Sequence, residues 1–110
     1  DITFIVKGVG MTQAQVKDIA FQLKGEIDKL VFIAGGISND KPHLTILLSD
    51  SLVKEFGLNA GQIIREVAQE IKGGGGGQPF FATAGGNDAE GIDRAIEKAH
   101  KMILRKVNVD

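Results

Sequence analysis

The chain has 110 residues, 43% of them hydrophobic and 25% charged, with a formal net charge of -1 at pH 7. This composition is typical of one globular domain, and the balance of charge excludes a global attraction to nucleic acid or membranes. Cysteine is absent, which excludes disulfides, thiolate catalysis and cysteine metal sites. No apolar run long enough to span a membrane and no signal peptide is visible, so we expect no membrane partner and a cytoplasmic location. The chain begins inside an apparent strand without a methionine, which indicates an excised piece of a longer protein.

The N-terminal part reads as a strand followed by a helix. Residues 2–9 alternate in the manner of a strand. In residues 12–25, Thr12 and Gln15 have capping-box spacing, and Gly25 occupies the position expected of a helix C-cap. One face of this helix carries the apolar residues Val16, Ile19, Ala20 and Leu23.

The rest of the chain predicts two paired strands, two helices, a strand and a last helix. The apolar run 29–36 indicates a strand covered on both faces, which we expect to pair with 43–49 as an antiparallel hairpin. Gly57 ends a short helix and Asn59 caps the next one. A strand in 79–86 and an amphipathic helix in 87–107 follow. The order is β-α-β-β-α-α-β-α, which predicts a single α/β domain with a mixed sheet of about four strands and helices packed on it.

Five consecutive glycines lie in the middle of this pattern. Because the strand and helix after Gly77 are too short to form a second domain, we expect the run to be a loop inside one fold. A phosphate-binding loop of the P-loop type is excluded, since the glycines follow a helix and lead into a strand. A loop without side chains still suits close contact with a sugar-phosphate backbone. We therefore predict contact with a nucleic-acid backbone through Lys72, Gly73, Gly74, Gly75, Gly76, Gly77 and Gln78.

A second candidate surface lies on the last helix. Its basic residues share one face and are accompanied by a single acidic residue, Glu97, so they predict either a solvated side or an RNA contact. The residues of this basic stripe are Arg94, Lys98, Lys101 and Arg105.

Catalysis finds little support in the sequence. His43 and His100 belong to no motif, and we expect both at the surface or its boundary. No spacing indicates a metal site, and no catalytic residue is predicted. Of the two aromatic residues after the glycines, we expect Phe80 in the core, while Phe81 is left open between the core and stacking on a base.

The segment GGGGGQPFFATAGG and the helix after it resemble the C-terminal globular domain of alanyl-tRNA synthetase, the DHH-associated domain. That pattern has a glycine-rich loop, an arginine, a proline and then AxAGG before a helix. The residues that match it are Gly75, Gly76, Gly77, Pro79, Ala82, Ala84, Gly85 and Gly86. Gln78 replaces the usual arginine, so a phosphate contact there would be neutral and weaker.

The resemblance implies that residues 1–110 are a non-catalytic tRNA-binding domain of a larger ligase. Such a domain grips the outer corner of alanine-specific tRNA and helps one tRNA serve aminoacylation and editing. Catalytic and editing domains of the same chain would lie upstream, with the ATP, magnesium and zinc of the family, and the fragment itself would hold no cofactor. Two relatives stay open as alternatives, namely the substrate-binding domain of a DHH-type phosphoesterase or oligoribonuclease and the tail of a free-standing alanyl-tRNA editing protein. A dimerisation module is a further, structural alternative.

Overall fold

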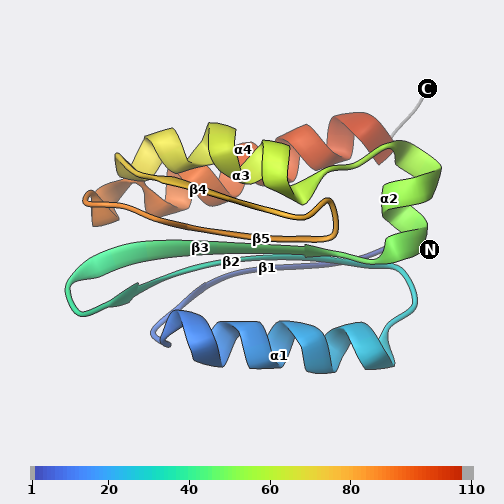
Figure 1. Ribbon diagram of the computed structural model, residues 1–110, viewed down its shortest axis with the longest axis horizontal. Coiled ribbons are helices and arrows are strands. Elements are labelled where there is room, and N and C mark those ends of the chain that lie inside the picture. The colour runs from blue at the N-terminus through green and yellow to red at the C-terminus, as the bar shows by residue number, and fades with distance from the viewer. Residues whose placement is uncertain (1, 108–110) are drawn as a thin grey trace.

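The computed structural model describes residues 2–107, without the side chains of residues 7–9. Four α-helices and five strands follow one another with two short 3-10 turns, η1 and η2 (Figure 1). In chain order, the elements are β1 Thr3–Val9, α1 Gln13–Glu26, β2 Leu30–Ser38, β3 Lys41–Leu48, α2 Asp50–Phe56, α3 Ala60–Val67, η1 Ala68–Ile71, β4 Gly74–Gly77, β5 Phe81–Gly85, η2 Ala89–Gly91 and α4 Ile92–Val107.

The strands form one mixed sheet in the order β1-β2-β3-β5-β4. β1 and β2 are parallel, and α1 makes the crossover between them. The remaining neighbours are antiparallel, including the predicted β2–β3 hairpin. The predicted α/β fold with a mixed sheet is confirmed, but the sheet has five strands rather than about four. The additional strand is β4, which consists of four glycines at an edge of the sheet.

Helices cover both faces of the sheet, with α1 on one side and α3 and α4 on the other (Figure 1). Along β2, Val31 and Ile33 belong to the larger core beneath α3 and α4, and Phe32 and Ala34 to the smaller core beneath α1. This alternation explains why the run reads as continuously apolar. No helix among residues 2–107 is long and apolar enough to cross a membrane.

Local signals fix most of the helix ends. Thr12 and Gln15 exchange the two hydrogen bonds of a capping box, at 3.2 and 3.0 Å. The side chain of Asn59 accepts a hydrogen bond from the backbone of α3 at 3.1 Å, and Gly57 ends α2 with a φ of 67°. The predicted end at Gly25 is wrong, because α1 continues to Glu26 and its capping residue is Ile27. Ile19, predicted on the apolar face of α1, is 37% exposed.

Candidate nucleic-acid interface

Residues 74–77 of the glycine run form a strand through antiparallel pairing with β5, and part of the run packs against β5 without room for side chains. A β-carbon added to Gly73, Gly75 or Gly77 would overlap the carbonyl oxygens of Gly85, Thr83 and Phe81 respectively. Gly74 is different, since a β-carbon there would meet no atom within 4 Å, and one at Gly76 would meet only the Arg65 guanidinium at 3.7 Å. Packing therefore requires glycine at Gly73, Gly75 and Gly77, but it does not explain why Gly74 and Gly76 are also glycine.

The backbone of β4 is also presented at the edge of the sheet. Gln78 and Phe81 close the β4–β5 hairpin with two mutual backbone hydrogen bonds of 2.8 and 3.3 Å. Because hydrogen-bonded pairs alternate along an antiparallel ladder, Gly76 and Gly74 are bonded to β5, and the N–H and C=O groups of Gly75 face the open edge. No side chain on the strand shields these groups. Lys72 and Gln78, both exposed, stand at its two ends.

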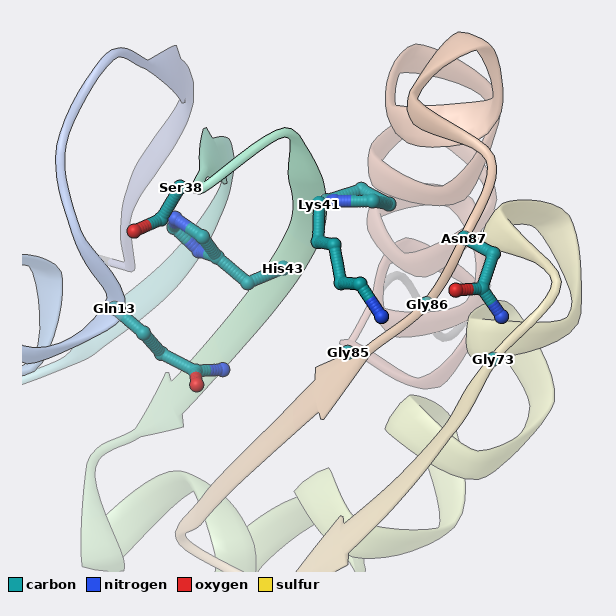
Figure 2. A pocket seen from close by; sticks show the side chains of 9 residues that line it. Gln13, Ser38, Lys41, His43, Gly73, Gly85, Gly86 and Asn87 are labelled. Atoms are coloured by element: carbon teal, nitrogen blue, oxygen red, sulfur yellow. The ribbon is translucent and has the colours of Figure 1, made fainter.

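A cleft of about 460 Å³ lies at the start of β4, next to the glycine pair Gly85 and Gly86 that follows β5. Figure 2 shows the ends of the Gln13 and Lys41 side chains directed at the backbone of Gly85, with Asn87 beyond Gly86. Among the described residues that line the cleft, Lys41 is the charged one and none is acidic. The full lining is Gln13, Ser38, Lys41, Pro42, His43, Gly73, Gly85, Gly86 and Asn87.

His43 is buried at the side of this cleft, 5% exposed, so its predicted place at the surface is wrong. Its Nε2 lies 2.8 Å from the Met11 carbonyl oxygen. Since a carbonyl only accepts, Nε2 donates, and in the neutral ring Nδ1 is left as an acceptor. Nδ1 is buried without a hydrogen-bond partner among the described residues. His43 thus ties the β1–α1 loop to β3 and shapes one wall of the cleft.

Of the residues that line the cleft, only Gly73 was predicted from the sequence as an RNA contact, and the polar wall was missed. Gln13, Lys41 and Asn87 come from three separate segments, and no motif joins them. Gln13 is positioned by its Nε2, which donates to the Ala84 carbonyl oxygen at 3.2 Å. The turn residues before Lys41 gave the one usable signal, because the ends of hairpins are common recognition sites.

The residues of the basic stripe share one face of α4, as predicted. The expectation that this face carries almost only positive charge is wrong. Carboxylates of α3 and η1 lie opposite it: Arg94 Nε is 3.3 Å from Glu70 Oε1, and Lys98 Nζ is 3.7 Å from Glu70 Oε2 and 4.0 Å from Glu66 Oε2. Within α4 itself, Lys101 Nζ lies 3.0 Å from Glu97 Oε1. These exposed pairs add little stability, yet they lower the net positive charge that the stripe offers to RNA. Its contact with RNA stays a prediction.

The aromatic residues after the glycines are both half-buried. Phe81 packs against the smaller core, where its ring lies 5.0 Å from that of Phe21. Phe80 stands in the hairpin turn beneath the Lys24 amine, which is 4.8 Å from its ring centroid. The expectation that Phe80 is the core residue is therefore wrong, and Phe81 has the more internal place.

Comparison with known proteins defines the family. The model of the DHHA1 domain matches residues 1–105. The chain belongs to the DHHA1 family. This DHHA1 domain is 48% identical over 102 residues to an alanine–tRNA ligase of Christiangramia forsetii, a match covering 93% of the chain and 12% of that enzyme. It is 58% identical over 88 residues to an alanine–tRNA ligase of Bacteroides thetaiotaomicron, covering 79% of the chain and 10% of that enzyme. The chain spans about a tenth of the length of these curated relatives.

A solved structure with the same fold is the C-Ala domain of alanyl-tRNA synthetase from Aquifex aeolicus. The TM-score is 0.78 at 29% sequence identity, and the match covers 94% of the DHHA1 domain and 92% of that chain. The resemblance drawn from the glycine and AxAGG segments is thereby confirmed, as is the arrangement of one α/β domain.

Proposed function

We propose that this DHHA1 domain is a tRNA-binding domain of an alanine–tRNA ligase with no chemistry of its own. The proposal is carried by the fold match to the C-Ala domain along 94% of the chain. It includes contact with the outer corner of alanine-specific tRNA, so that one bound tRNA serves both aminoacylation and editing. Catalytic and editing domains of the same chain would supply the sites for ATP, magnesium and zinc. A cytoplasmic location follows from this role.

The geometry supplies a surface suited to a sugar-phosphate backbone. β4 carries no side chains of its own and offers the main-chain groups of the exposed Gly75, and RNA is held largely through phosphate and ribose contacts. The cleft adds Lys41 as a cation and the amides of Gln13 and Asn87 as donors. Lys72, in a left-handed conformation with a φ of 52°, carries a second cation to the start of the strand. These groups position RNA and supply no nucleophile or acid–base pair.

The direct test is a titration of the 110-residue chain with alanine-specific tRNA and, separately, with a plain RNA duplex of the same charge. We expect tRNA to bind more tightly, because the outer corner of a folded tRNA has a shape that a duplex lacks. Gly74→Val should weaken tRNA binding while the domain stays folded, since a side chain there enters open space. Gly10→Val is the matched control, because that exposed glycine is equally open and lies outside the proposed surface. Equal binding of both RNAs, or of both variants, would contradict the proposal.

A further inference from the structure

A second surface, separate from the glycine strand and rich in aromatic residues, lies between α1 and the β4–β5 hairpin. Three of the six phenylalanines of the chain gather there, namely Phe21, Phe80 and Phe81. Two lysines of α1 lie over the rings. Lys17 Nζ is 5.8 Å from the Phe81 centroid, and Lys24 Nζ is 5.7 Å from that of Phe21 and 4.8 Å from that of Phe80. We call these five residues the Phe–Lys patch.

The patch is open to a ligand, although it borders the core. Phe21 is 38% exposed, and Phe80 is half-buried in the turn. A single exposed phenylalanine is ordinary, whereas a pair of tilted rings with two amines within about 6 Å is a prepared aromatic and cationic surface. Asp50, which lies 3.6 Å from Lys24 Nζ, helps to hold that amine in place and is itself exposed.

The patch and the cleft lie at opposite ends of β5. Phe81 begins the strand and Gly85 ends it, so they are separated by four residues or about 13 Å. Phe81 packs on the α1 side of the sheet, and Gln13 reaches the Ala84 carbonyl from the same helix. A single RNA molecule that enters the cleft can therefore reach the patch along α1.

We propose that the Phe–Lys patch stacks an unpaired base of the bound RNA, with Lys17 and Lys24 beside the phosphates that flank it. The inference rests on the proposed function and names a contact that the glycine strand cannot make. A base offers a π-face that can stack on an aromatic side chain. The lysines next to the rings make a polyanion such as RNA a better partner for the patch than an apolar protein surface would be. Phe21 is the primary stacking residue. Its ring is 38% exposed and, unlike that of Phe81, does not pack against the smaller core.

The chain contains no tryptophan and no tyrosine, which makes a specific reporter possible. In Phe21→Trp the single indole should lose fluorescence in a saturable way as tRNA is added. Gln22→Trp is the matched control, since its exposed side chain leaves the same helix about 100° away and should show little change. Phe21→Ala should weaken tRNA binding by roughly 5-fold to 150-fold, the range expected for loss of one base–aromatic stack.

A second probe separates this proposal from the proposed function. Both tryptophan variants are titrated with a short single-stranded oligouridine as well as with tRNA. Quenching of Phe21→Trp by the oligonucleotide supports the patch even if tRNA binds no better than a duplex, in which case only the tRNA role fails. If tRNA binds the wild-type chain but Phe21→Ala binds equally well and Phe21→Trp shows no quenching, the stacking proposal is overturned. Absence of quenching by both RNAs overturns it as well.

Discussion

Two neighbouring glycines of β4 should differ in their response to substitution by alanine: the change should destabilise the domain at Gly75 and leave its stability almost unchanged at Gly74. Gly75→Ala places a methyl group where the Thr83 carbonyl oxygen and the Ala84 α-carbon already lie, so β4 must move away from β5. Overpacking of this kind costs about 1–3 kcal/mol. At roughly 4 °C per kcal/mol for a domain of this size, the melting temperature should fall by about 4–12 °C.

Gly74→Ala is the matched control. Its β-carbon would meet no atom within 4 Å, and Gly74 is not among the residues with positive φ. We expect its free energy of unfolding to stay within about 0.5 kcal/mol of the parent, with a slight gain possible because alanine has less freedom in the unfolded chain. Far-ultraviolet circular dichroism during heating measures both variants. Equal melting temperatures for Gly75→Ala and Gly74→Ala would refute the packing argument for the alternating glycines.

Three further predictions concern binding and local stability. Gln78→Arg should raise affinity for tRNA in a filter-binding assay, because an exposed guanidinium can pair with phosphate where an amide makes a weaker bond; unchanged affinity would place Gln78 away from the RNA. Lys41→Ala should make the negative slope of log affinity against log salt shallower by about one. Lys101→Ala should change the slope less, because that amine already pairs with Glu97 at 3.0 Å; an equal effect would bring the basic stripe into the main contact surface. Asn59→Ala should cost about 1 kcal/mol in chemical denaturation through loss of the α3 cap, and a cost near zero would show that the cap is dispensable.

Much of the fold could be predicted from local signals in the sequence. Thr12 with Gln15, Asn59 and Gly57 act on their own backbone neighbours, so their effect is visible without knowledge of the fold. Gly25 failed as the C-cap because the packing of Ile27 against the smaller core and the bond from Ile27 N–H to the Leu23 carbonyl move the cap two residues further, to Ile27. Local signals in the sequence therefore predicted the helix ends correctly, except where tertiary contacts determined the end.

The edge strand and the cleft could not be predicted in the same way. Glycine is depleted in strands and carries no side-chain period, so a run of five reads as a loop. β4 is a strand because it pairs with β5, whose backbone approaches Gly75 and Gly77 too closely for a side chain at those two positions. The cleft depends on Gln13, Lys41 and Asn87, which meet only after the sheet has formed. Likewise, the carboxylates opposite Lys98 come from α3 and η1, and the helix sequence alone could not reveal them.

In the proposed complex, RNA approaches the main chain of β4 and the adjoining cleft. Backbone amide spectra of the nitrogen-15-labelled chain, recorded during titration with alanine-specific tRNA, test it directly. We expect the amide signals of Gly74, Gly75, Gly76 and Gly86, with that of Lys41, to shift or broaden before those of α4. Saturable tRNA binding that leaves these glycine signals unchanged and perturbs the α4 amides instead would contradict it.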